Sequence, residues 1–144
     1  MDEVINELTK LAGQRQFDKR SDGYWFDIPH LDVIEMAQMM LKNRVRLCTM
    51  TAIEREDGET DIIYHYIGGK SAFNIRVTTQ GQTLTSLANL LPGAAWIERE
   101  IHDLYAVNFD GHPDLRPLVR PKELPVGFYR KSVSADIKKG SEAK

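Results

Sequence analysis

Apolar residues recur every three to four positions in four parts of the chain, a spacing typical of amphipathic helices that bury one face. Gly13 and Pro92-Gly93 follow two of these segments as stop signals, and Pro29 suits the first turn of a third. The pattern therefore predicts helices over residues 1–12, 29–43, 84–91 and 94–109.

Strand-forming residues, separated by turn residues, occupy most of the remaining body. Ser21-Asp22-Gly23 predicts a hairpin between strands at 14–19 and 24–28, and two glycine-containing turns separate three further strands. These strands are expected over residues 44–54, 61–67 and 71–79. The 44–54 strand has apolar residues on both faces, which favours a central position in the sheet. The 71–79 strand alternates, so one of its faces should be buried.

The order of the elements has no internal repeat and no regular alternation of strands with helices, which favours an α+β fold over a doubly wound sheet. We expect a two-layer sandwich: a mixed five-stranded sheet with helices on one side, followed by an extended C-terminal tail. Four of the six prolines lie between Pro113 and Pro125, so neither a helix nor a central strand can continue there. The expected parts are a domain over residues 1–110, an extended docking tail over 111–137 and a disordered end over 138–144.

Composition limits the possible functions. A length of 144 residues and 42% hydrophobic content suit one domain, and a net charge of -2 gives no reason to expect nucleic acid as a partner. From Asp110 onward the chain has 8 basic and 5 acidic residues, a net charge of +3. The part before Asp110 has 11 basic and 16 acidic residues, a net charge of -5. A basic C-terminal part of this kind is what an arm that binds an acidic partner would have. Cys48 is the only cysteine, which excludes a disulfide within the chain and a cysteine-ligated cluster or zinc site. The sequence shows neither a signal peptide nor a membrane span, so a cytoplasmic protein is expected.

The densest polar cluster lies on the predicted helix at 94–109 and has three interpretations. It can be a solvated, self-paired helix face, since Arg99 and Asp103, like Glu98 and His102, are i,i+4 neighbours. It can be catalytic, with Glu98 or Glu100 as general base and His102 as acid, although no nucleophile or metal stands nearby in sequence. It can bind another protein. The four histidines have no metal-ligand spacing, so metal binding is not expected.

Three blocks in this region carry a family resemblance. Glu98-Arg99-Glu100, Asp103-Leu104-Tyr105 and the turn-forming segment Gly111 to Arg116 occur in order over about 20 positions. Together they resemble the signature of the 30 kDa subunit family of respiratory complex I and of the related energy-converting membrane-bound hydrogenases. Ala106 stands where that family usually has glycine, and the ending from Pro121 to Lys131 is shorter than the family's, which favours the hydrogenase type.

The resemblance implies a non-catalytic connecting subunit of a membrane-associated redox complex. Such a subunit holds no cofactor of its own; the iron–sulfur clusters and any nickel–iron centre belong to its partners, a hydrogenase-like large subunit and a small iron–sulfur subunit. It lies in the cytoplasm on the inner face of the cell membrane, which it contacts only through the complex. The residues implied to bind partners are Glu98, Arg99, Glu100, Asp103, Tyr105, Gly111, His112, Pro113, Asp114 and Arg116.

Two other functions stay open at this point. A stand-alone adaptor or regulatory domain would keep the fold without a redox partner, and an acid/base enzyme would use Glu100 and His102. The electron donor, the electron acceptor and any pumped ion depend on other chains.

Overall fold

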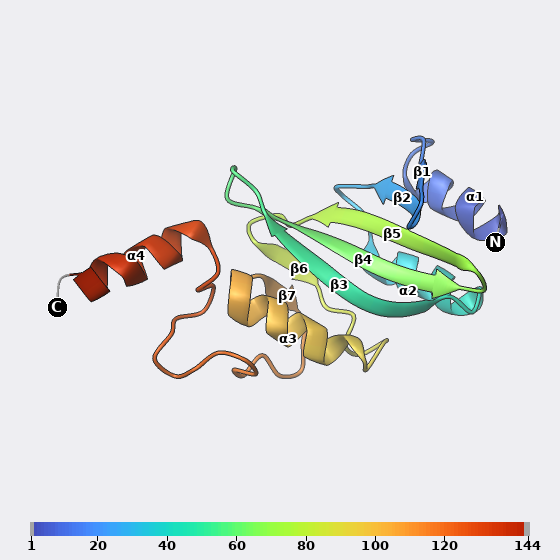
Figure 1. Ribbon diagram of the computed structural model, residues 1–144. Helices are drawn as coiled ribbons and strands as arrows, with labels where there is room; N and C mark the ends of the chain where they lie inside the picture. Colours follow the sequence, from blue (N-terminus) through green and yellow to red (C-terminus); the bar gives the residue numbers. More distant parts are fainter. Residues whose placement is uncertain (1, 143–144) are drawn as a thin grey trace.

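The structure, a computed structural model that describes residues 2–142, is built on a sheet flanked by helices (Figure 1). The five strands of the sheet come from the N-terminal part of the sequence, and two short strands and two helices follow them. The elements are α1 (Asp2–Leu11), β1 (Asp18–Arg20), β2 (Gly23–Asp27), α2 (Val33–Lys42), β3 (Arg46–Glu54), β4 (Thr60–Gly68), β5 (Ser71–Thr78), β6 (Thr83–Thr85), α3 (Ala94–Tyr105), β7 (Asn108–Asp110) and α4 (Lys131–Glu142).

The five-stranded sheet is mixed, in the order β1-β2-β5-β4-β3. β2 runs parallel to β5, and the remaining neighbours are antiparallel. Because β2 and β5 are parallel, a crossover must join them, and α2 lies in that connection. β6 and β7 form a separate parallel pair. The α+β class and the mixed five-stranded sheet predicted from the sequence are confirmed.

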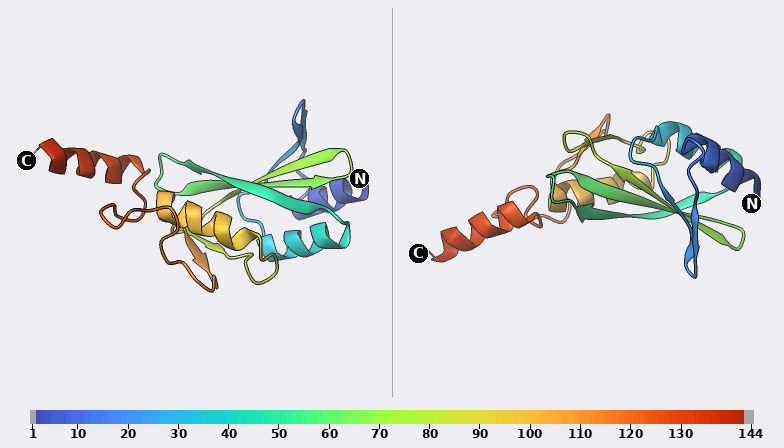
Figure 2. Two further views of the ribbon diagram at one scale, coloured as in Figure 1. Left: turned by 60° about the horizontal axis from the view of Figure 1, so that its bottom comes forward. Right: turned by 90° about the horizontal axis from the view of Figure 1, so that it is seen from above.

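One hydrophobic core joins the sheet to three helices. Val4 and Leu8 of α1, Met36 and Met40 of α2, and Ile101 of α3 are buried in the same cluster. The sheet contributes alternating side chains, as expected when only one face is covered by helices. These include Ile62, Tyr64, Tyr66, Phe73, Ile75 and Val77. Figure 2 shows α2 and α3 on the same side of the sheet.

The predicted helix boundaries hold at α1 but shift at α2. Gly13, with φ +67°, follows α1 as expected. Pro29 does not lie in the first turn of α2. Its carbonyl accepts a hydrogen bond from Thr78 N at 3.1 Å and so extends the pairing of β2 with β5. Asp32 caps the helix instead, because its Oδ1 accepts from the amides of Ile34 and Glu35 at 3.0 Å each. The first hairpin is present, with β1 shorter than predicted.

The prediction of a central position for β3 is wrong, since β3 is one of the two edge strands of the sheet, opposite β1. Its apolar side chains on the core side are explained by α3, which packs against β3 in place of another strand. On the other face Ile53 is 39% exposed, and a register shift between Leu47 and Thr49 marks a bulge around Cys48. A bulge is one of the features that keep an exposed edge from pairing with another sheet.

The prediction of a helix over 84–91 is also wrong. Thr83–Thr85 form β6, and Ser86 N donates to Asp110 O at 2.8 Å, so the segment pairs with β7. Only a tight turn follows, in which the amides of Leu90 and Leu91 both donate to Leu87 O. Contacts with distant parts of the chain therefore outweigh the helical spacing of the leucines.

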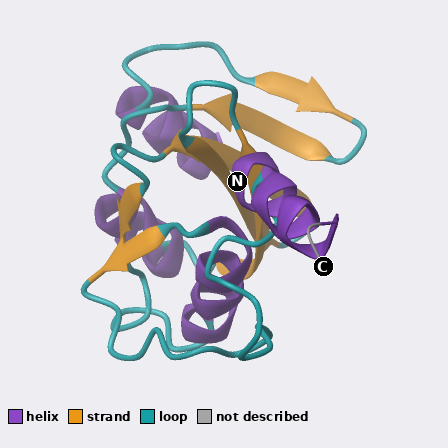
Figure 3. Cartoon of the chain, turned by 90° about the vertical axis from the view of Figure 1, so that its left-hand side faces the viewer, coloured by secondary structure: helices purple, strands orange, loops and turns teal. Residues whose placement is uncertain are grey.

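α3 ends earlier than predicted, and α4 extends into the part of the chain that was predicted to be disordered. Ala106 adopts a left-handed conformation with φ +57° and ends α3, after which β7 forms. Residues 111–130 have neither helix nor strand, in keeping with their prolines, but α4 is helical through Glu142. The tail predicted to be extended over 111–137 is therefore helical from Lys131 onward, residues 138–142 are helical rather than disordered, and 143–144 lie outside the described residues. Figure 3, which looks onto the left-hand side of Figure 1, shows α4 in front of the rest of the chain.

Candidate functional site: α3 and the loop that folds over it

The three signature blocks come together on α3 and the loop formed by residues 111–120, which we call the signature loop. α3 turns Ala94, Glu98 and Ile101 toward the protein interior, and Trp96 and Glu100 toward the outside. Its apolar stripe is thus interrupted by a carboxylate that points inward. The side chains of Glu98 and Asp103 are both wholly buried, which is rare for acidic residues that lack compensating partners.

Glu98 ties α3 to the turn that follows β6. Ser86 Oγ donates to Glu98 Oε2 at 2.6 Å, and Leu87 N donates to Glu98 Oε1 at 2.7 Å. Ser86 Oγ in turn accepts from Ala88 N at 3.0 Å. Burial raises the pKa of Glu98, and these two donors offset that effect only in part. Glu98 is therefore a structural carboxylate that fixes the 86–88 turn.

Asp103 holds the end of the signature loop. Its Oδ2 accepts from three successive amides, of Leu118 at 2.8 Å, Val119 at 2.9 Å and Arg120 at 3.3 Å. Arg120 Nε lies 3.7 Å from Asp103 Oδ1, which forms an ion pair. Burial alone would raise the pKa of Asp103, but the three amides and Arg120 outweigh it and lower the pKa. A single carboxylate thus fixes the path of an otherwise irregular segment.

His112 joins the start of the signature loop to the first turn of α3. Its Nε2 lies 3.0 Å from Ala95 O, and its Nδ1 lies 2.9 Å from Asp114 N. Because Nδ1 must accept from an amide, these partners assign a neutral ring with its proton on Nε2. Glu98 Oε2 is 4.0 Å from the same Nε2, so the ring lies close to the buried carboxylate as well as to the first turn of α3.

Two arginines complete the middle of the signature loop. Arg99 Nε donates to Arg116 O at 3.1 Å, and Arg99 Nη2 donates to Pro117 O at 3.2 Å. Arg116 pairs with Asp114 through two contacts of 2.9 and 2.8 Å, and this pairing holds the pKa of Asp114 well below its usual range. The Arg116 side chain is itself exposed. Residues 112–120 are therefore attached to α3 at their start, middle and end.

The chain then returns to the C-terminal end of α3. Gly127 N donates to Asp103 O at 2.7 Å, and Tyr129 N donates to Leu104 O at 2.9 Å. Gly127 has φ +78°, and a Cβ placed on it would stand 2.8 Å from Ala106 Cβ. The carbonyl of Tyr105, at the end of α3, accepts hydrogen bonds from Gln82 Nε2 and from the Arg130 side chain of the returning segment. Glycine is thus required where the returning chain touches α3.

The predicted partner-binding residues divide into two groups. Glu98, Asp103 and the His112 side chain are buried and engaged within the chain. The other seven keep some exposure, and Glu100, Gly111, Pro113 and Arg116 are the most open of these. The helix pairs expected from the spacing, Arg99 with Asp103 and Glu98 with His102, are not among the salt bridges of residues 2–142. These side chains bind more distant segments instead.

An assembled acid/base pair is not found in this region. Glu100 is exposed, whereas His102 is half-buried and its Nδ1 lies 2.9 Å from Val107 O. Within the described part of the chain these two residues share no hydrogen bond, and no group of three or more His, Cys, Asp or Glu is placed to hold a metal ion. In the same part, no helix combines the length and apolar character that crossing a bilayer requires.

Ser86, Arg120 and Gly127 belong to this site but were not predicted from the sequence. Ser86 lies inside the helix predicted over residues 84–91, and nothing in the neighbouring sequence indicates its bond to Glu98. Gly127 carried a weak signal, since Pro125-Val126-Gly127 is turn chemistry. Trp96 begins the charged helical segment but was not among the predicted site residues, although 64% of it is exposed.

The sequence is similar to subunits of respiratory complexes. The curated relatives include the C subunits of NADH-quinone oxidoreductase from Mesorhizobium japonicum, 45% identical over 62 residues, and from Rhizobium rhizogenes, 36% identical over 80 residues. The first match covers 41% of this chain and 31% of the relative, and the second 54% and 40%. The chain therefore matches well under half the length of these relatives.

Two solved structures share the fold. One is a chain of the membrane-bound sulfane sulfur reductase, described as an archaeal respiratory membrane complex, with a TM-score of 0.74 and 18% identity over 98% of this chain and 91% of that one. The other is a trypsin-resistant fragment of Nqo5, with a TM-score of 0.64 and 23% identity over 79% and 98%. The profile of the respiratory-chain NADH dehydrogenase 30 kDa subunit matches residues 26–138. This chain belongs to that family.

Proposed function

We propose that this chain is a non-catalytic connecting subunit of a membrane-associated redox complex, of the NADH:quinone oxidoreductase or energy-converting hydrogenase type. Family membership supports the class of complex. Its partners would be a hydrogenase-like large subunit and a small iron–sulfur subunit, which would carry the iron–sulfur clusters and any nickel–iron centre. The subunit would reach the inner face of the cell membrane only through them, and would support electron transfer by holding these chains in place.

The observation that carries the proposal is the way α3 uses its buried carboxylates. Glu98 and Asp103 bind amides and a hydroxyl from two other segments, so the outer face of α3 and the signature loop form one fixed surface. That surface exposes Trp96 and Val119, with 64% and 48% of each residue accessible, beside Arg99, Glu100 and Arg116. We call these five residues the docking face.

The composition of the docking face is that of a binding hot spot. Tryptophan and arginine are enriched among the residues that dominate interface energies, and the Arg99 guanidinium lies 5.9 Å from the centre of the Trp96 ring. A fixed loop loses little conformational entropy on binding, so more of the contact energy remains for affinity. In this arrangement Glu98, Asp103 and His112 are positioning residues, and partners contact Trp96, Arg99, Glu100 and Arg116.

The test is assembly in the native host. The full chain, its Trp96→Ser variant and its Ile53→Ser variant are tagged and purified from membranes, and co-purifying chains are identified by mass spectrometry. Both positions are exposed apolar residues, but Ile53 lies on the uncovered face of the sheet. We expect the large and iron–sulfur subunits to accompany the wild type and Ile53→Ser, and their recovery to fall at least tenfold with Trp96→Ser.

Recovery of both partner subunits with Trp96→Ser at the wild-type level would refute the docking face. Recovery of no redox subunit with the wild type would refute the proposed function itself. Circular dichroism of each purified variant establishes that a loss of assembly does not come from unfolding.

A further inference from the structure

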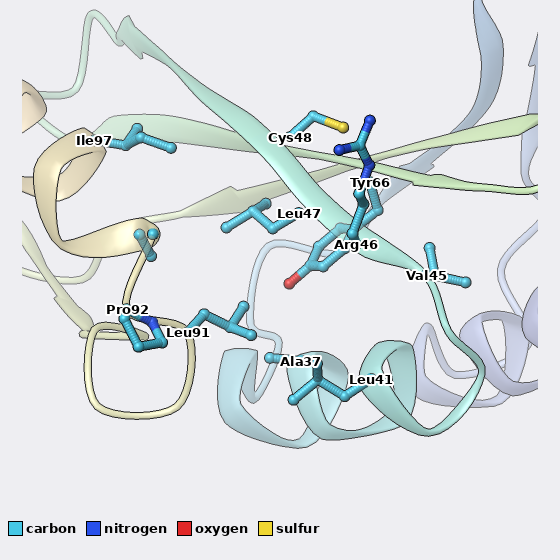
Figure 4. A pocket seen from close by; sticks show the side chains of 12 residues that line it. Ala37, Leu41, Val45, Arg46, Leu47, Cys48, Tyr66, Leu91, Pro92 and Ile97 are labelled. Carbon is cyan, nitrogen blue, oxygen red and sulfur yellow. The ribbon is translucent and has the colours of Figure 1, made fainter.

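A groove lies beside the docking face, between the end of α2, the start of β3 and the beginning of α3 (Figure 4). Its volume is about 310 Å³, at the lower end of the range for small-molecule sites. Aliphatic side chains make up most of its wall, and Leu41, Leu47, Leu91 and Ile97 retain partial exposure there. Among the twelve residues that line the groove none is acidic.

The groove contains one polar group that lacks a partner. Tyr66 is 1% exposed, and its hydroxyl forms no hydrogen bond. Figure 4 shows that hydroxyl pointing into the space bounded by Leu47, Leu91 and Ala37. Burial raises the pKa of Tyr66, so the phenol keeps its proton and stays a hydrogen-bond donor at physiological pH. A buried donor left unpaired costs free energy that a suitable acceptor would recover.

Water is a poor occupant for this position. A buried water is held by two to four polar partners, and the floor of the groove offers only the Tyr66 hydroxyl among its side chains. Arg46 and Cys48 also line the groove, but Figure 4 shows the guanidinium and the sulfur pointing away from the floor. An apolar occupant that brings its own acceptor satisfies the donor and covers the aliphatic wall at the same time.

We infer that this groove binds a small apolar molecule that carries one neutral hydrogen-bond acceptor, such as the carbonyl of a ketone or ester. A carboxylate fits less well, because no cationic side chain points at the floor to offset the cost of burying a full charge. Gly93 and Ala94, at the N-terminus of α3, line the same groove, but the Ala94 amide already donates to Leu91 O at 2.8 Å, so the Tyr66 hydroxyl is the donor that the ligand meets. Entry requires rotation of Leu47 or Leu91, which lie next to the hydroxyl.

The ligand site is independent of the proposed function, since it depends only on residues of this chain. The test therefore uses the purified full chain without partners. Acetophenone is the probe with a carbonyl, and ethylbenzene is a probe of similar size without one. Each is titrated while two-dimensional 15N–1H NMR spectra are recorded. We expect saturable shifts with acetophenone that centre on the amides of Leu47, Leu91 and Gly93.

Two tyrosine variants isolate the hydrogen bond. Tyr66→Phe removes the donor and keeps the ring, so the Kd for acetophenone should rise about fivefold, the value of one neutral hydrogen bond, while the Kd for ethylbenzene changes less than twofold. Tyr64→Phe is the matched control: Tyr64 also has a buried, unpartnered hydroxyl, but it does not line the groove. Its affinity for acetophenone should equal that of the wild type.

A third variant keeps the inference testable if Tyr66→Phe does not fold. Leu91→Trp places a large side chain at the half-exposed wall and should abolish the shifts caused by both probes. Saturable binding that centres outside the groove, or no binding to the wild type, would overturn the inference. An equal loss of affinity for both probes in Tyr66→Phe would overturn the role given to the hydroxyl.

Discussion

Glu98 and Asp103 lie five positions apart on α3, are both wholly buried, and have pKa values shifted in opposite directions. The difference lies in their partners. Burial dominates at Glu98, whose hydrogen bonds come from one hydroxyl and one amide, whereas three amides and an arginine surround Asp103. The two carboxylates should therefore give the protein opposite responses to pH.

At Asp103 the lowered pKa means that the folded state favours the ionised form. This contribution to stability is complete above the unfolded pKa of about 3.9 and is lost as the pH falls through the lowered value. We expect Asp103→Asn to lower the free energy of unfolding at pH 7 by about 1–3 kcal/mol, since the amide accepts more weakly and presents a donor to Arg120. Urea denaturation measures the loss.

The same substitution should loosen the signature loop. Trypsin cleavage after the exposed Lys122, two residues beyond the loop, is expected to accelerate in Asp103→Asn, because Leu118, Val119 and Arg120 lose a charged acceptor. Glu100→Gln is the matched control, since it removes an exposed carboxylate from the same helix. Equal cleavage rates in the two variants would show that Asp103 does not hold the loop.

At Glu98 the raised pKa makes the stability depend on pH in the opposite direction. Folded wild type binds the proton more tightly than unfolded chain, so its stability falls as the pH rises from about 4.3 to the raised folded value. Glu98→Gln cannot ionise and lacks this dependence. The unfolding free energy of the wild type minus that of the variant, measured in urea from pH 4 to 8, should decrease with pH and then become constant. A difference that increases with pH would contradict the assignment.

At the scale of elements, the junction between α3 and the returning chain depends on two small residues. Ala106 has φ +57°, and Gly127, with φ +78°, leaves no room for a Cβ against it. Gly127→Ala should therefore cost about 2–4 kcal/mol, from backbone strain together with the clash. Gly58→Ala provides the control, because Gly58 also has a positive φ but open space around it, and should cost only about 1 kcal/mol.

Ala106 permits a test in the opposite direction. Glycine adopts the left-handed conformation without penalty, so Ala106→Gly should leave the stability unchanged or raise it by up to about 1 kcal/mol. It also removes the Cβ that the new Cβ of Gly127→Ala would meet. The cost of Gly127→Ala should consequently be smaller in the Ala106→Gly background, a coupling that thermal unfolding of the four proteins measures. If the two substitutions changed the unfolding free energy in a strictly additive way, the clash between the two Cβ atoms would be excluded.

The same elements show what sequence could and could not predict. The helix at α2, the meander of β3 to β5 and the break after Asp110 follow from local spacing and prolines, and the structure contains them. The edge position of β3 and the strand at Thr83–Thr85 depend on α3 and β7, which lie far away in sequence. The inward orientation of Glu98 and Asp103 likewise depends on distant partners, Ser86 and Leu118. From the sequence alone, the charged residues of α3 could therefore not be distinguished from a solvent-exposed helix face.

At the scale of the whole molecule, α4 stands away from the body of the protein in both Figure 1 and Figure 2. Within residues 2–142 few hydrogen bonds attach it: Lys131 N donates to the Glu54 carboxylate at 3.1 Å, and Ser134 Oγ donates to Phe128 O at 2.7 Å. By contrast Arg130, directly before it, binds the carbonyls of Gly58 and Tyr105. The stable part of the molecule should therefore extend through Arg130, with α4 as an appendage.

Two truncations test this division. A chain that ends at Arg130 keeps every contact of the returning segment with α3, so its unfolding free energy should fall by less than about 1 kcal/mol. A chain that ends at Arg120 also loses the bonds from Gly127 and Tyr129 to Asp103 and Leu104, and should lose about 2 kcal/mol or more. Urea denaturation compares the two with the full chain. If the first truncation destabilises the protein as much as the second, α4 contributes to the stability of the body and is not an appendage.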